Sequence, residues 1–454
     1  MRYGLIRLDI EDYVTPESDD GLAVMLDQLD HHRLPASFGV VGEKAEALSR
    51  HGRQDLLRRL AAKSALGFHS HSHSRHPTLA EDLAERGYAD SVDRFIARER
   101  PGVESVSRLI RPPDYFTQPG GNWVPSALDA LPRLGMSIMF SESWNSYLVE
   151  LTEPVWCGQV LHFSLPVPQP APFLLGLPQS LEQAIARLES VPARIADGGA
   201  FTIMTHPTEL VTSQFWDVVN FGGGKTRRPL TPAPLRSRNQ RERAAAALDT
   251  YWQAARRLGK RGVQWVDILT LAEHVAPRWP VEVRRGQLAT ALAESGLGPS
   301  RRAETGTLSA AQLIWALAYF TRHPQADAAI VPRVGPPAAW VAGQPTAATA
   351  TLRSARVEAG AEAILSQVAR EGVLPGAWPA EGTPIEDWAG AAGQHLFGAR
   401  QEPLPLTFLS YVKDPSRLHW DWPVFAPGFQ PYRLWEETRR LAWTLAPVRW
   451  QAMP

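Results

Sequence analysis

Residues 66–77 read LGFHSHSHSRHP, a short apolar run that passes directly into a cluster of histidines. The apolar run has the length and composition of a buried strand, and four of the 13 histidines of the chain follow it within eight residues. Imidazole is a favoured ligand of zinc and similar divalent ions, and His69 and His73 can converge on one ion if the chain coils after the strand. We therefore predict that His69 and His73 bind a metal, with His71 and His76 as further candidates.

The first apolar run of the chain also ends in candidate metal ligands. Residues 3–12 read YGLIRLDIED, a β-prone pattern that breaks into acids. Side chains two residues apart lie on the same face of a strand, so Asp9 and Glu11 share a face, and Asp12 follows where the strand becomes a turn. A metal held by two neutral imidazoles needs an anionic oxygen ligand. We predict that these three acids provide it, together with a general base.

Two later strand ends carry polar residues as well. Arg111 is the last residue of the predicted strand 108–111 and precedes two prolines, whose rigidity would fix a guanidinium that can orient a carboxylate. His206 ends the apolar run 200–206. The carboxyl ends of parallel strands meet at one edge of a sheet, so we predict that Arg111 and His206 lie beside the acids and the histidines.

Strand and helix patterns alternate through the first part of the chain. Strands are predicted at 3–10, 36–42, 66–69, 108–111, 137–141, 200–206 and 263–268, with helices at 22–30, 54–63, 82–98, 126–134, 181–196 and 243–258. This alternation predicts an α/β fold with a parallel, barrel-like sheet over residues 1–277. From residue 278 to 454 strand signals fade and helical periodicity prevails, which predicts a mainly helical accessory domain.

Composition excludes several classes of protein. The 454 residues include 47 basic and 47 acidic side chains, so no overall charge attracts nucleic acid or an anionic membrane. With the single cysteine Cys157, the chain can form neither an internal disulfide nor a thiolate metal cluster. No apolar stretch reaches the length of a membrane span or a signal peptide, so we expect a cytoplasmic protein without a membrane partner.

One further segment imitates a known motif. Residues 222–226 read GGGKT, like the end of a phosphate-binding loop, but that motif requires a glycine at the position of Val219. We therefore expect no nucleotide site there. The basic residues that follow, between Lys225 and Arg243, are interpreted as a solvated loop over the mouth of the barrel rather than a nucleic-acid surface.

The four strand-end motifs, in this order, resemble the polysaccharide deacetylase family, also called the NodB homology domain or carbohydrate esterase family 4. The matching segments are Glu11-Asp12, His69-Ser70-His71-Ser72-His73, Arg111-Pro112-Pro113 and Met204-Thr205-His206. The resemblance covers about residues 3 to 277. It implies a distorted (β/α) barrel of seven strands.

The resemblance also implies roles for single residues. His69 and His73 would bind the metal together with one acid, a second acid would be the general base, Arg111 would hold that base, and His206 would be the general acid. A gapless match makes Glu11 the base and Asp12 the metal ligand, whereas strand alternation pairs Asp9 with Glu11. The family has two adjacent aspartates before a glycine, and the sequence DIEDY at residues 9–13 departs from this pattern.

These residues predict a hydrolase that uses a divalent metal, with zinc as the expected ion. The ion polarises an amide carbonyl, a carboxylate takes a proton from water and an imidazolium protonates the leaving amine. The expected reaction is hydrolysis of an N-acyl C–N bond, with an N-acetylated sugar or a related small compound as substrate. The alternatives are a ring-opening amidohydrolase of the allantoinase type and a non-catalytic carbohydrate-binding barrel.

Overall fold

The structure is a computed structural model in which the chain divides into two compact units. It describes residues 1–142, 147–149, 154–166, 180–275, 281–300, 303–304, 306–338, 354–376, 385–398, 404, 406–414 and 423–448. Unit 1 consists of Met1–Pro154, Val160–His274 and Pro415–Leu434, and unit 2 of Val155–Gln159, Val275–Asp414 and Trp435–Pro454. The predicted boundary at residue 277 lies outside the described residues, and the observed division is not linear along the chain.

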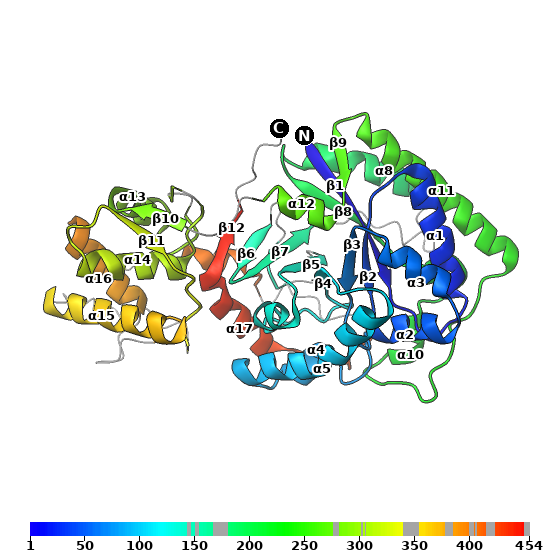
Figure 1. The fold of residues 1–454 in the computed structure, drawn as a ribbon, viewed down its shortest axis with the longest axis horizontal. Coiled ribbons are helices and arrows are strands. Elements are labelled where there is room, and N and C mark those ends of the chain that lie inside the picture. Colours follow the sequence, from blue (N-terminus) through cyan, green and yellow to red (C-terminus); the bar gives the residue numbers. More distant parts are fainter. Residues whose placement is uncertain are drawn as a thin grey trace. The chain divides into compact units, whose positions relative to one another are not determined.

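The strands of unit 1 form a parallel, curled sheet (Figure 1). They are β1 (Arg2–Ile10), β2 (Ser37–Val40), β3 (Ala65–Phe68), β4 (Tyr115–Thr117), β5 (Ile138–Glu142), β7 (Val160–Leu165), β8 (Ala200–Thr205) and β9 (Val263–Val266). Their order is β7-β5-β4-β3-β2-β1-β8, and β9 also pairs with β1. A backbone hydrogen bond of 3.0 Å from Thr202 in β8 to Pro166, which follows β7, joins the two ends of this order. The predicted α/β class and distorted (β/α) barrel are confirmed.

The register of the sheet gathers the carboxyl ends of several strands at one edge. In β1, Asp9 lies opposite Gly39 of β2, and Leu8 lies opposite Thr205 of β8. Nearly every residue of β1 is buried, as expected for a strand covered on both faces. The residues that follow β1, β3 and β8 therefore emerge close together, as the strand-end argument predicted.

Helices cover the outside of this sheet (Figure 1). The helices of unit 1 are α1 (Ser18–His32), α2 (Gly42–Arg50), α3 (Gln54–Ala61), α4 (Leu79–Leu83), α5 (Tyr88–Leu109), α6 (Ala127–Ala130), α8 (Leu181–Ser190), α9 (Thr208–Val211), α10 (Trp216–Phe221), α11 (Arg238–Gly259) and α12 (Ile268–Glu273), with short 3-10 turns at Leu131–Leu134 and Val191–Arg194. The predicted strand at 108–111 is wrong, because α5 continues to Leu109 and β4 begins only at Tyr115.

Unit 2 is mainly helical in its described part, as predicted. Its helices are α13 (Arg285–Ser295), α14 (Ala310–Arg322), α15 (Ser354–Glu371), α16 (Ile385–Phe397) and most of α17 (Tyr432–Leu441), with 3-10 turns at Thr407–Tyr411 and Ala442–Thr444. Two antiparallel strand pairs were not predicted: β10 (Val281–Arg284) with β11 (Ala328–Val331), and β6 (Val155–Cys157) with β12 (Leu445–Pro447). Across the described chain, no helix is both long and apolar enough to cross a membrane.

Candidate metal centre

The histidine motif forms a tight loop after β3. The Nδ1 atom of His69 donates a hydrogen bond of 2.9 Å to the carbonyl of Thr117 at the end of β4, so Nε2 is the unprotonated nitrogen of the ring, and it lies 3.2 Å from Oε2 of Glu11. His73 adopts a left-handed backbone conformation, with φ 52°, and its N–H bonds the hydroxyl of Ser70. A non-glycine residue in this conformation costs on the order of 1 kcal/mol, and such strain concentrates at functional sites.

Glu11 brings a carboxylate to these two imidazoles. Its Oε2 atom lies 2.8 Å from Nε2 of His73 and 3.2 Å from Nε2 of His69. One ligand atom from each of the three residues lies within 4.8 Å of the other two, and all three side chains are buried. The structure thus brings His69 and His73 together as predicted, with Glu11 as the acid beside them.

This donor set fits a divalent cation. Nε2 of His73 is buried and faces Oε2 of Glu11 at 2.8 Å, and Nε2 of His69 lies beside the same oxygen. Burial opposes the charged form of His73, but the carboxylates of Glu11 and Asp217 raise its pKa to about 10. Two imidazoles and one carboxylate are donors that divalent ions bind in proteins, so these three residues could hold such an ion.

Residues of α10 contact two of these three side chains. The indole N–H of Trp216 donates a hydrogen bond of 2.8 Å to Oε1 of Glu11. Oδ1 of Asp217 lies 3.4 Å from Nδ1 of His73, and Oδ2 of Asp217 accepts a hydrogen bond from Ser74. Sequence reasoning missed both residues, because nothing local in the sequence at 212–221 connects them to residues 11 and 73.

Asp9 is held beside the histidines by an arginine of its own strand. The guanidinium of Arg7 bonds both carboxylate oxygens of Asp9, through Nε at 2.8 Å and through Nη2. Oδ2 of Asp9 lies 3.8 Å from Nε2 of His69 and 3.8 Å from Nε2 of His206. Burial opposes ionisation of Asp9, but the charges of Arg7, His69 and His206 lower its pKa overall.

His206 faces Asp9 and Glu11 from the end of β8. Its Nε2 atom lies 3.8 Å from Asp9 and 4.0 Å from Glu11, and its Nδ1 atom lies 3.3 Å from Oε1 of Glu209 in α9. Burial alone would lower the pKa of His206, but Glu11 and Glu209 raise it to about 9. The predicted position of His206 beside the acids and histidines is therefore observed, and Glu209 is a partner that the sequence analysis did not identify.

Asp12 is not among the three residues of the donor set, which differs from its predicted place in the metal site. Its Oδ1 atom accepts hydrogen bonds from the N–H groups of Val14 and Thr15, and its Oδ2 atom accepts one of 2.7 Å from Thr208. Both oxygens thus stabilise the turn after β1 and its contact with α9. The structure places Asp9 and Glu11 beside His69, with carboxylate oxygens 3.8 Å and 3.2 Å from its Nε2 atom, which is the pairing that strand alternation predicted.

Arg111 also lies away from the site. It forms a salt bridge of 2.8 Å with Asp114 and donates hydrogen bonds to the carbonyls of Lys63 and Ser64. These residues precede β3 and β4, so they lie at the amino ends of the strands, whereas the site lies at the carboxyl ends. Arg7 takes the place that the sequence analysis gave to Arg111.

The two remaining histidines of the motif do not join the donor set. His76 lies 2.7 Å from Glu81 through Nδ1 and 2.9 Å from the carbonyl of Phe221 through Nε2, so it connects the histidine loop to α10. The backbone N–H of His71 bonds the carboxylate of Glu99 in α5 at 2.7 Å. Burial raises the pKa of Glu99 to about 7, although Arg98 and this hydrogen bond oppose the rise.

The raised pKa of Glu99 predicts a pH-dependent stability. From pH 4.5 to about 7 the folded chain keeps a proton on Glu99 that the unfolded chain releases, so the free energy of unfolding falls as the pH rises. Over this interval the free energy of unfolding of the wild type should fall by up to about 3 kcal/mol relative to that of Glu99→Gln. Urea denaturation of both proteins at a series of pH values measures the effect. If the free energies of unfolding of the two proteins changed in parallel with pH, Glu99 would ionise in its normal range.

Comparisons with known proteins give structural similarities only. No family model matches the sequence, and no curated protein sequence matches it. A protein described as a polysaccharide deacetylase from Mycobacterium smegmatis is similar in structure, with 17% identity and a TM-score of 0.40, over 60% of this chain and 89% of that chain.

Two further solved structures carry related descriptions. The peptidoglycan deacetylase PdaC from Bacillus subtilis shares 15% identity with a TM-score of 0.33, over 60% of this chain and 90% of its own. A CE4 family pseudoenzyme from Bacillus anthracis shares 11% identity with a TM-score of 0.34, over 59% and 64% of the two chains. Because deacetylases and a pseudoenzyme both occur among these similar structures, their names do not assign an activity to this chain.

Proposed function

We propose that this chain is a metal-dependent hydrolase of N-acyl C–N bonds that removes the acetyl group from an N-acetylated sugar or a related small compound. One observation carries the proposal: a Glu-His-His donor set lies within 4 Å of a second carboxylate, Asp9, and of a third imidazole, His206. A purely structural metal site needs neither of these two additional groups.

Glu11, His69 and His73 would hold the ion, for which we propose zinc. A divalent ion in this position supplies Lewis acidity, which polarises an acyl carbonyl and acidifies water. Three protein ligands, rather than four, are typical of catalytic zinc sites.

Asp9 and His206 would move the protons. The carboxylate of Asp9, kept ionised and oriented by the two hydrogen bonds of Arg7, accepts the proton of the attacking water. Nε2 of His206 then donates a proton to the departing amine, while the contact of Nδ1 with Glu209 orients the ring and favours its charged form. The two groups that would move protons thus lie within 3.8 Å of each other and beside the donor set.

A panel of substrates tests this proposal. Protein depleted of metal and reloaded with zinc is incubated with N-acetylglucosamine, its oligomers, other N-acetylated amines and cyclic ureides, and the release of acetate or the opening of the ring is measured. We expect acetate from at least one N-acetylated substrate. Turnover of ureides alone would replace the proposal with a ring-opening amidohydrolase. No turnover by zinc-loaded protein on the whole panel would favour a non-catalytic barrel.

A further inference from the structure

The helix α10 supplies an outer shell to the candidate metal ligands. The indole N–H of Trp216 donates a hydrogen bond to Oε1 of Glu11, and Oε2 of the same carboxylate faces the two imidazoles. Asp217 lies beside Nδ1 of His73, and Ser74 contacts both groups, which favours a proton on Nδ1 and a free lone pair on Nε2. Trp216 and Asp217 are completely buried, so their positions depend on how α10 is packed.

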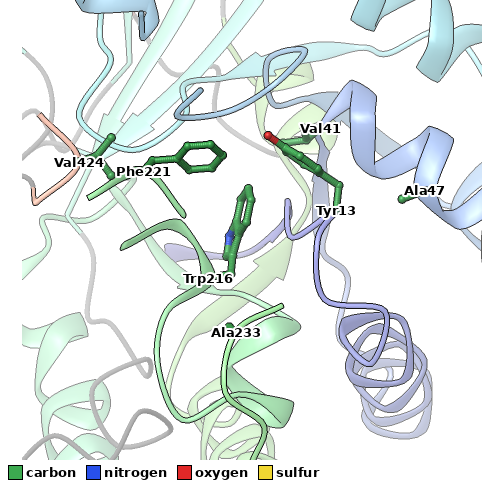
Figure 2. Close-up of a cluster of buried hydrophobic side chains, with 7 residues drawn as sticks. All are labelled: Tyr13, Val41, Ala47, Trp216, Phe221, Ala233 and Val424. Carbon is green, nitrogen blue, oxygen red and sulfur yellow. The ribbon is translucent and has the colours of Figure 1, made fainter. Parts of the chain in front are cut away.

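A hydrophobic cluster fixes α10 in this position (Figure 2). Trp216 packs edge-on against Tyr13 and Phe221, with ring centroids 5.0 Å and 5.5 Å apart. The buried members of the cluster are Tyr13, Val41, Ala47, Trp216, Phe221, Ala233 and Val424. Val424 comes from a segment far along the chain that nevertheless belongs to the same compact unit as the barrel.

This distant segment, residues 423–426, is also hydrogen-bonded to the end of α10. The N–H of Gly223 donates to the carbonyl of Pro423 at 2.8 Å, and the N–H of Gly224 donates to the carbonyl of Val424 at 2.9 Å. Gly224 has φ +77°, and a Cβ atom there would lie 2.6 Å from Cβ of Ala426. The close approach of the two backbones therefore requires glycine at position 224.

We propose that residues 423–426 position α10, and through Trp216 and Asp217 set the affinity of the site for its metal. The inference rests on the proposed function, since it assumes that Glu11, His69 and His73 bind an ion. It assigns a task to the C-terminal part of the chain without placing any of its side chains in the reaction. Residues 423–426 are positioning residues, because they act on the ligands only through α10.

Two glycine substitutions test the position of the segment. Gly223→Ala and Gly224→Ala both place a side chain on a backbone with positive φ, but a Cβ atom at Gly223 meets nothing within 4 Å. Both variants therefore carry the strain of a side chain at positive φ, but only Gly224→Ala brings a Cβ atom into collision with Ala426. We expect Gly224→Ala to weaken zinc binding about 10-fold or more relative to Gly223→Ala, the usual effect of disturbing an outer shell. Competition with a chelator measures the Kd for zinc, and the absorption spectrum of bound Co²⁺ reports ligand geometry.

A tryptophan pair tests the outer shell itself. Trp216→Phe removes the N–H that bonds Glu11, whereas Trp252→Phe changes an equally buried tryptophan whose N–H has no hydrogen-bond partner among the described residues. Only Trp216→Phe should weaken zinc binding and shift the Co²⁺ spectrum, with the melting temperature of both metal-free variants as the control for folding.

If the wild type binds zinc and the two variants of each pair bind it equally tightly, the inference is overturned and the proposed function stays intact. Equal affinity within the glycine pair alone would overturn the role of residues 423–426. A wild type that binds no zinc would overturn both the inference and the proposed function.

Discussion

Glu11→Gln is expected to abolish stoichiometric zinc binding and, with it, turnover. Glu11 contributes the only anionic oxygen of the donor set, and both of its neighbouring imidazoles are neutral when they bind a metal. Glutamine keeps the shape of the side chain and can still accept the hydrogen bond of Trp216, so the change removes charge rather than packing. Loss of an inner ligand should exceed the roughly 100-fold effect typical of outer-shell changes. Metal analysis after dialysis against a weak chelator checks the result.

Asp12→Asn is the matched control, because it neutralises the adjacent acid. Both oxygens of Asp12 accept hydrogen bonds within the turn or from Thr208, so its loss should cost about 1–3 kcal/mol of unfolding free energy and leave zinc bound. If Asp12→Asn lost the metal while Glu11→Gln kept it, the assignment from the gapless family match would be correct and the structural assignment wrong.

The positions of Asp9, Glu11, His69, His73 and His206 could be predicted because each depends on a local pattern. A buried strand brings its last inward-facing side chains to the carboxyl edge of a parallel sheet, and strand alternation places Asp9 and Glu11 on one face. Strand alternation does not place Asp12 on the face of Asp9 and Glu11. Asp12 lies in the turn after β1, where it accepts hydrogen bonds from the N–H groups of that turn. The observed geometry agrees with strand alternation, which pairs Asp9 with Glu11, and the roles of the three acids stay predictions.

Arg111 was misplaced because the sequence does not mark where α5 ends. The apolar pair Leu109-Ile110 has the β-propensity of a strand, yet α5 continues to Leu109. The predicted strand therefore lay several residues before β4, and this placed Arg111 at the carboxyl edge of the sheet. In the structure, Arg111 precedes β4 at the amino edge and forms a salt bridge with Asp114 there. Arg7 carried no motif, although its alternation with Asp9 along β1 already places both on one face.

The support of the site could not be predicted from the sequence at all. Trp216 and Asp217 reach Glu11 and His73 only because the chain folds over long separations, and Val424 reaches the same cluster from a still more distant segment. Local periodicity holds no information about such contacts. The return of residues 423–434 to the barrel unit also depends on contacts over a long sequence separation.

Asp9→Asn is expected to lower kcat by about 10²- to 10⁴-fold, the usual contribution of a positioned general base, while the zinc content stays at one ion per chain. The amide cannot accept a proton from water at neutral pH, and Asp9 lies outside the donor set, with Oδ2 3.8 Å from Nε2 of His69. Steady-state kinetics and metal analysis on the same preparation separate this outcome from that of Glu11→Gln, in which metal and activity are lost together.

Arg111→Met provides the control for Asp9→Asn, because it tests the arginine that sequence reasoning assigned to the base. The salt bridge of Arg111 with Asp114 is partly exposed and lies at the opposite edge of the sheet, so its loss should cost about 1 kcal/mol or less from the ion pair itself and leave kcat unchanged. A fall in kcat for Arg111→Met as large as that for Asp9→Asn would mean that Arg111 reaches the site after all. An Asp9→Asn protein that kept full activity would leave His206 and Glu209 as the remaining proton-transfer groups, and the hydrolytic mechanism would have to be rebuilt on them.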